Sequence, residues 1–248
     1  MQGNALQAFG YLMRGAQMLS HRKLRPFVII PLLINLLIFG SLVAYTLSTL
    51  NEYIEQFMGS IPEWLSFLRW VIWPVVGITI SLVTGYLFTA VALLIASPFN
   101  SLLAEKAEEI ITGEEVESLE GIGAALKDIP RSILRELQKF FYYLPLLLLV
   151  LVLSFVPAVN FLAPLMWFAL GAWMMSIQYL DYPMDNHRLP FAEVKNAARA
   201  RPVSSFGFGG GIALITGIPV LNFFIVPAAV VGATLYWCEE FRRPSRIR

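Results

Sequence analysis

The sequence predicts an all-α integral membrane protein, and both its composition and its long uncharged stretches predict it. Of 248 residues, 57% are hydrophobic and 14% are charged, whereas ordinary soluble domains carry roughly 25% charged residues. A soluble fold of this size lacks the polar shell that would cover so much apolar surface. The stretches without any charged side chain are 26–51, 70–104, 140–180 and 202–238. Because a spanning helix needs about 20 apolar residues, each stretch can hold membrane-embedded helix.

The first two stretches each predict one long transmembrane helix, at 27–50 and 70–96. Both are long enough to span a bilayer with some tilt. The run 27–50 is also longer than the roughly 7–15 residues of a signal-peptide core. We therefore expect a retained helix there and no cleavable signal peptide.

The last two stretches are interrupted, and each interruption contains the pattern Pro-x-x-Asn-Phe. The pattern starts at Pro157 in one stretch and at Pro219 in the other. Proline ends helices and asparagine favours turns, so we predict two helical hairpins, 140–180 and 203–238, with breaks at 156–164 and 218–227. Their arms of about 15–19 residues are marginal for full spanning, which favours partial penetration of the bilayer.

Three other segments complete one membrane domain, 1–248. Apolar residues at helical spacing predict amphipathic interfacial helices in the N-terminus, 1–26, and at 119–137. The latter lies in a helical segment, 97–139, whose glutamate-rich part, 105–120, is interpreted as a solvated surface. A basic tail, 239–248, closes the chain.

The distribution of lysine and arginine predicts the topology. Four lie before the first helix, five in 97–139, four in 181–201 and four in the tail, but 51–69 has only one. Basic residues are enriched on the cytoplasmic side of membrane proteins. We therefore expect both termini inside, 51–69 outside, and both hairpins entering and leaving on the cytoplasmic side.

A basic cluster at the start of the first long helix predicts an anion site. Pro26 suits the first helical position, and we expect the N–H groups of Phe27 and Val28 to be free there. Free amides and the positive end of the helix dipole attract anions, and Arg25 can donate two parallel hydrogen bonds. The alternative interpretation is charge that fixes topology and touches lipid phosphate. The candidate anion-binding residues are Leu24, Arg25, Phe27, Val28, Arg22 and Lys23.

A second polar cluster, 178–191, follows the first predicted hairpin. It is rich in aromatic and turn-forming residues, as a cavity mouth is, or it is a helix-ending loop whose carboxylates pair with Arg188. His187 is interpreted as a hydrogen-bonded loop residue. No charged residue lies inside the four apolar stretches, so coupling ions or protons would act at their mouths, at Glu239 among others. The other candidate pathway or coupling residues are Asn35, Asn100, Glu105, Asp181, Asp185, Asn160 and Asn222.

Several function classes find no support. The sequence has no phosphate-binding Gly-x-x-x-x-Gly-Lys loop, no Cys/His cluster for a metal and no catalytic constellation. Its single cysteine, Cys238, excludes an internal disulfide, and its net charge of +1 does not favour nucleic acid. We expect no enzyme, no cofactor and no metal.

The order of motifs from about Phe9 to Arg242 resembles the CysZ family of bacterial sulfate permeases. The matching segments are 24–35, 97–105, 142–145, 178–187, 219–223 and 232–234. The resemblance implies sulfate uptake across the inner membrane for cysteine biosynthesis. It also implies two long transmembrane helices, two partly penetrating hairpins and a homo-oligomer.

The resemblance further implies a sulfate site, since the family carries Gly-[Ile/Leu]-Arg at the start of its first long helix. Leu24 and Arg25 match this motif. Lys23 replaces the usual glycine, and Pro26 stands where some members have a second arginine, so Arg22 or Lys23 would supply a second charge. We expect sulfate as the partner, sulfite as a competitor and lipid around the protein.

One other class of function stays open at this point. A membrane scaffold or lipid-binding protein without transport activity would have the same interfacial helices and basic rim, but it would not conduct anions. The residues leave the driving force open among a channel and coupling to protons or sodium. They also leave open whether Arg25 serves transport or regulation.

Overall fold

The computed structural model describes residues 4–59, 69–116 and 129–242, and these residues form helices and connecting turns without a β-strand. The predicted all-α class is therefore confirmed for the described part of the chain. Three of its helices are long and apolar enough to cross a membrane: Arg25–Thr46, Pro130–Ser154 and Asn160–Asn186. The chain divides into two compact units, Ile29–Ser97 and the combination of Met1–Val28 with Pro98–Arg248.

The smaller unit is built from parts of the two longest helices, α2 (Arg25–Gly59) and α3 (Arg69–Thr112). Phe39 and Phe88 join these helices, with ring centroids 4.8 Å apart. Both helices extend beyond the expected ranges, 27–50 and 70–96. The end of an apolar run does not end a helix. The end of α3 needs Gly113, whose φ of 72° is the left-handed conformation that glycine adopts most easily.

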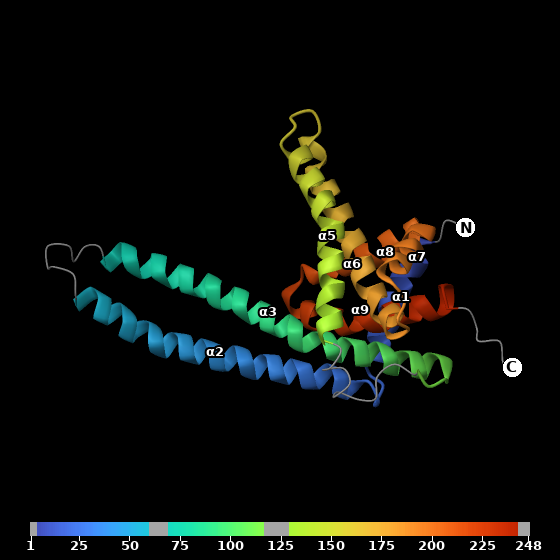
Figure 1. Cartoon of the computed structure of the whole chain (residues 1–248), viewed down its shortest axis with the longest axis horizontal. Helices are drawn as coiled ribbons and strands as arrows, with labels where there is room; N and C mark the ends of the chain where they lie inside the picture. The colour runs from blue at the N-terminus through green and yellow to red at the C-terminus, as the bar shows by residue number, and fades with distance from the viewer. Residues whose placement is uncertain (1–3, 60–68, 117–128, 243–248) are drawn as a thin grey trace. The chain divides into compact units, whose positions relative to one another are not determined.

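In the larger unit, α5 (Ile129–Ser154) and α6 (Ala163–Asn186) form an antiparallel pair around the short helix η2 (Asn160–Leu162), as Figure 1 shows. The chain reverses at 155–162, around Pro157. The helices are longer than the arms expected for 140–180, because α5 already begins in the segment assigned to 97–139. At about 1.5 Å per residue, each is long enough to cross a bilayer core of about 30 Å.

The next helices are α7 (Phe191–Ala200), α8 (Pro202–Thr216) and α9 (Pro219–Glu240). The chain turns between α8 and α9 at 217–218 only, so the expected break over 218–227 is wrong. Pro219 starts α9, because proline needs no N–H partner in the first turn. Asn222 and Pro227 then lie within the helix.

The N-terminal helix α1 (Ala5–Met18) packs against α8 and α9 (Figure 1). Its residues Ala8, Tyr11 and Leu12 are buried, while Leu6 is 82% exposed. The helix is amphipathic as expected, but its apolar face is largely covered by protein. It is thus an integral part of the core and not solely an interfacial helix.

Small residues allow these helices to approach closely. A Cβ atom at Gly209 of α8 would overlap the Ala172 carbonyl oxygen of α6 and lie 2.8 Å from the Ser176 nitrogen. A Cβ atom at Gly232 of α9 would lie 2.8 Å from the Tyr11 carbonyl oxygen of α1. The glycine-rich run 207–211 therefore allows close helix packing.

An exposed ion pair ties α1 to the end of α9 and makes this contact sensitive to pH. Arg14 donates two hydrogen bonds to the Glu239 carboxylate, at 2.6 and 3.2 Å, and these bonds hold the pKa of Glu239 below its ordinary value of 4.5. A lowered carboxylate pKa contributes stability above the ordinary value, and this contribution is lost as the pH falls through the lowered value.

We expect α1 to open more often at about pH 3 than at about pH 7. Hydrogen exchange of the α1 amides, corrected for intrinsic rates, measures this opening. The Arg14→Gln variant should show a smaller difference between the two pH values. An equal difference in the variant and the original protein would assign the acid sensitivity to other groups.

Candidate functional site

A network of charged side chains joins α5 to α6 at the end of the pair remote from its turn. On α5, Arg131, Arg135 and Lys139 are spaced four residues apart, and on α6 so are Asp181 and Asp185. Residues four apart lie on one face of a helix. The pairs 131/185 and 135/181 are symmetric about residue 158, in the turn, so the antiparallel register brings opposite charges together.

Asp181 is the centre of the network. Its Oδ1 accepts hydrogen bonds from Nε and Nη2 of Arg135, at 2.9 and 2.7 Å, and its Oδ2 lies 2.8 Å from Nζ of Lys139. Asp181 and Lys139 are 4% and 3% exposed. Burial makes such pairing obligatory, because an isolated charge would lose its hydration without compensation.

The network continues to both sides of Asp181. Asp185 pairs with Arg131 and lies 3.7 Å from Arg135, whose Nη1 also donates to the Leu189 carbonyl at 2.9 Å. Lys139 has a second carboxylate partner, Glu136, at 2.7 Å. The network therefore contains as many carboxylates as cations.

Polar contacts from the end of α3 support the same part of α6. Asn100 donates to the Tyr182 hydroxyl at 3.3 Å. Asn186 accepts a hydrogen bond from the Ser101 hydroxyl at 2.5 Å and donates one to the Ser101 carbonyl at 2.9 Å. These bonds orient the polar residues of 178–187, most of which belong to α6 and not to a loop.

A second ionic cluster surrounds Glu108 of α3. Its Oε1 lies 2.8 Å from Nε2 of His187 and 3.3 Å from Nε of Arg242, which also pairs with Glu114 at 2.7 Å. Glu108 is fully buried and Glu105 is 3% exposed, so the expectation of a solvated surface is wrong for these two residues. His187 is hydrogen-bonded, as the sequence indicated, and it caps α6.

The basic segment before α2 has one buried anchor among exposed cations. Leu24 is fully buried, whereas Arg22, Lys23 and Arg25 are exposed. Arg25 donates from Nε to the Ser20 carbonyl at 3.0 Å. Within the described residues no carboxylate pairs with these three cations. Their charges are thus available to an anion.

The Phe27 amide at the start of α2 differs from the prediction of a free N–H group. The Phe27 N–H donates to the Leu24 carbonyl at 3.1 Å, and the Arg25 N–H donates to the His21 carbonyl at 3.3 Å. The Phe27 amide is therefore not free, because the chain enters α2 through a preceding turn that supplies acceptors. An anion here would depend mainly on the side chains.

The structure brings some of the candidate pathway residues together and separates others. Asn100, Asp181 and Asp185 meet around the charge network, and Glu105 pairs with Lys106 at 3.3 Å. Asn160 lies at the turn of the α5–α6 pair, whereas Asp181 lies about 27 Å along α6 from the start of that helix. The Oδ1 atom of Asn35 is buried without a hydrogen-bond partner among the described residues. Asn222 lies in the first helical turn of α9, just after the turn at 217–218.

The basic residues of α5 entered the prediction of the topology but not that of the site. The four-residue spacing of 131, 135 and 139 matches that of 181 and 185, and this match was the available signal. Glu108 and Arg242 carried no comparable signal, because they come from distant segments.

Comparison with known proteins decides the family. A family model described as "Sulfate transporter CysZ/Etoposide-induced protein 2.4" matches residues 11–227. The chain belongs to this family. One relative, "Sulfate transporter CysZ" of Vibrio parahaemolyticus serotype O3:K6 (strain RIMD 2210633), is 40% identical over 235 residues, which cover 94% of this chain and 95% of the relative. The resemblance to the CysZ family is thereby confirmed over nearly the whole chain, and the α5–α6 charge network lies within the matched region.

Proposed function

We propose that this chain is a sulfate permease that carries sulfate into the cell without ATP hydrolysis, for cysteine biosynthesis. The observation that carries the proposal is the 40% identity to a sulfate transporter along 94% of the chain. The apolar helices are consistent with a membrane transporter. The charge network supplies cations that can attract an anion, namely Arg131, Arg135 and Lys139 of α5.

The chemistry of the network suits a dianion. Sulfate must replace its hydration with hydrogen-bond donors when it enters a low-dielectric environment, and Arg135 offers a planar guanidinium that pairs well with oxyanions. In the proposed mechanism, sulfate displaces Asp181 from Arg135 and Lys139. The displaced carboxylate then competes with sulfate for these cations, which prevents the anion from being held too tightly to leave.

The exposed cations before α2 are the proposed first binding site. Arg25 would donate its free Nη groups to sulfate oxygens, and Arg22 and Lys23 would add positive charge. The buried Leu24 fixes the segment in place. This assignment agrees with the match of Leu24 and Arg25 to the family's sulfate-binding motif.

We place the protein in a bacterial inner membrane with both termini in the cytoplasm, because only 51–69 is poor in basic residues. In this arrangement α2 and α3 are the long transmembrane helices, and the pairs α5–α6 and α8–α9 are the two hairpins. We also propose a homo-oligomer, since two spans and two hairpins offer few helices to surround a hydrophilic path.

Sulfate uptake into liposomes that contain only this protein tests the proposed function. The liposomes receive no ATP and no gradient other than that of radiolabelled sulfate. We expect uptake above that of empty liposomes, with competition by sulfite and unlabelled sulfate but not by chloride. If uptake stays absent when proton and sodium gradients are added in turn, a scaffold or lipid-binding role is favoured instead.

The Arg25→Ala variant tests the first binding site. We expect sulfate affinity to fall by a factor of about 10 to 100, because one charge-assisted contact contributes about 1.5–3 kcal/mol. Isothermal titration with sulfate measures the affinity, and uptake measures the transport. The matched control is Arg199→Ala, which removes an exposed arginine of α7. Unchanged affinity and uptake in Arg25→Ala would refute the assignment.

A further inference from the structure

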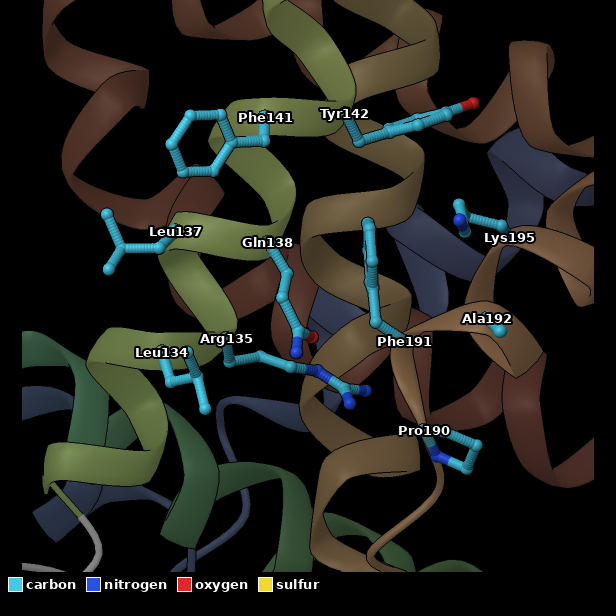
Figure 2. A pocket seen from close by; sticks show the side chains of 10 residues that line it. All are labelled: Leu134, Arg135, Leu137, Gln138, Phe141, Tyr142, Pro190, Phe191, Ala192 and Lys195. Atoms are coloured by element: carbon cyan, nitrogen blue, oxygen red, sulfur yellow. The ribbon is translucent and has the colours of Figure 1, made fainter.

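An open pocket of about 720 Å³ lies where α5 meets the start of α7 (Figure 2). Its walls come from two sources, the face of α5 that includes Gln138 and Phe141, and the first part of α7. The latter supplies Phe191 and Lys195. The pocket lies beside the charge network, which it shares only through Arg135.

The pocket is electropositive. It is lined by two cations and by no carboxylate. Arg135 is already paired with Asp181, but Lys195 has no acidic partner among the described residues. The ammonium of Lys195 lies 5.2 Å from the ring centroids of both Tyr142 and Phe191. These rings hold the charge at the pocket without neutralising it.

The pocket is also amphipathic along α5. Lys139 is the last charged residue of this helix, and the helix continues to Ser154 without charge. Leu137 and Phe141, which line the pocket, are 47% and 67% exposed, and Figure 2 shows them on the side away from Lys195. In a membrane-crossing helix such a transition from charged to apolar marks the level of the lipid headgroups.

We propose that this pocket binds one anionic phospholipid, with the phosphate at Lys195 and an acyl chain along Leu137 and Phe141. The volume admits a headgroup and the beginning of a chain. The positive lining selects an anionic lipid over a zwitterionic one. The inference rests on the proposed membrane crossing of α5 and is independent of sulfate conduction.

Native mass spectrometry of the full-length protein in detergent tests the proposal. Phosphatidylglycerol and phosphatidylcholine are added separately, and bound lipids are counted per chain. We expect one tightly retained phosphatidylglycerol. In Lys195→Gln its affinity should fall about fivefold, as expected for one basic residue at a lipid surface, whereas Lys195→Arg should retain it. The matched control, Arg199→Gln, removes one charge from the same helix outside the pocket and should bind as the original protein does.

A second variant tests whether lipid binding needs the open volume of the pocket, instead of the charge of Lys195. Ala192 is exposed and lines the pocket, so Ala192→Phe fills it and should also reduce phosphatidylglycerol binding. Equal binding of both lipids, or unchanged phosphatidylglycerol binding in Lys195→Gln and Ala192→Phe, would overturn the proposal. A wild-type protein that retains no lipid would also overturn the proposal. That result would favour a protein contact at this surface. Counting bound lipids does not involve sulfate. The proposed lipid site can therefore be supported or refuted whether or not the protein takes up sulfate.

Discussion

Replacement of Asp181 by asparagine is expected to destabilise the folded protein by about 3–5 kcal/mol, since breaking a buried pair leaves uncompensated charge. Arg135 would keep only a neutral acceptor at Oδ1 in place of a carboxylate, and Lys139 would meet an amide NH2, itself a donor, at the position of Oδ2. Asparagine has nearly the same shape, so the change isolates the charge. Unfolding of the detergent-solubilised protein by increasing denaturant measures the loss, and sulfate uptake is expected to fall with it.

A double-mutant cycle separates the interaction between Asp181 and Arg135 from the contacts that each residue makes with other residues. Arg135→Gln alone should also be destabilising, but Asp181→Asn combined with Arg135→Gln should cost less than the sum of the single changes. Lys139 keeps Glu136 as a partner in both cases. Glu239→Gln is the control, because that carboxylate belongs to an exposed pair, and exposed pairs contribute about 1 kcal/mol or less. Additive effects in the cycle would show that Asp181 and Arg135 do not act together.

The second large effect is expected from Gly209→Ala. The added methyl group would occupy the position of the Ala172 carbonyl oxygen on α6, and a backbone atom cannot move aside as a flexible side chain can. Overpacking of a core costs about 1–3 kcal/mol, and sometimes more. We expect the cost at Gly209 to reach or exceed the upper end of this range and to lower the yield of folded protein. Size-exclusion chromatography and thermal unfolding measure both quantities.

Gly171→Ala is the matched control for this prediction. Gly171 lies in α6 next to Ala172, and its added Cβ atom would meet nothing within 4 Å. Alanine favours helix over glycine by about 1 kcal/mol, so this variant should be as stable as the original protein or more stable. If Gly209→Ala and Gly171→Ala behaved alike, α6 and α8 would not be in close contact at this position.

The sequence predicted the position of the first turn but not the length of the helices around it. Pro157 and Asn160 mark a turn by local chemistry alone. The ends of α5 and α6 lie among charged residues that are compatible with either helix or loop. In the structure, ion pairs between the two helices join these ends, and no local pattern contains such pairs.

The two asparagine–proline patterns show why similar motifs have different outcomes. Pro157 lies in a turn, whereas Pro219 starts α9 and Asn222 is helical. Proline is compatible with both positions, because it disrupts a helix interior but suits the first turn. The choice depends on what the neighbouring segment packs against. In α9 that segment continues into residues buried against α1 and α6.

The sequence by itself determined that the chain lies in a lipid membrane, that its fold is helical and which family it belongs to. A chain with so few charges and such long apolar runs must place helices in lipid, because lipid offers no partner for unpaired backbone groups. The basic segment before α2 was also visible, since neighbouring residues define it. Only the tertiary structure decided that Arg135 and Lys139 face Asp181 and that Glu108 is buried. It also decided that Lys195 lines an electropositive pocket, with no acidic partner in the described part of the chain. The physical reason is that pairing and burial depend on helix register and on segments far apart in the chain, whereas hydrophobicity and turn chemistry act locally.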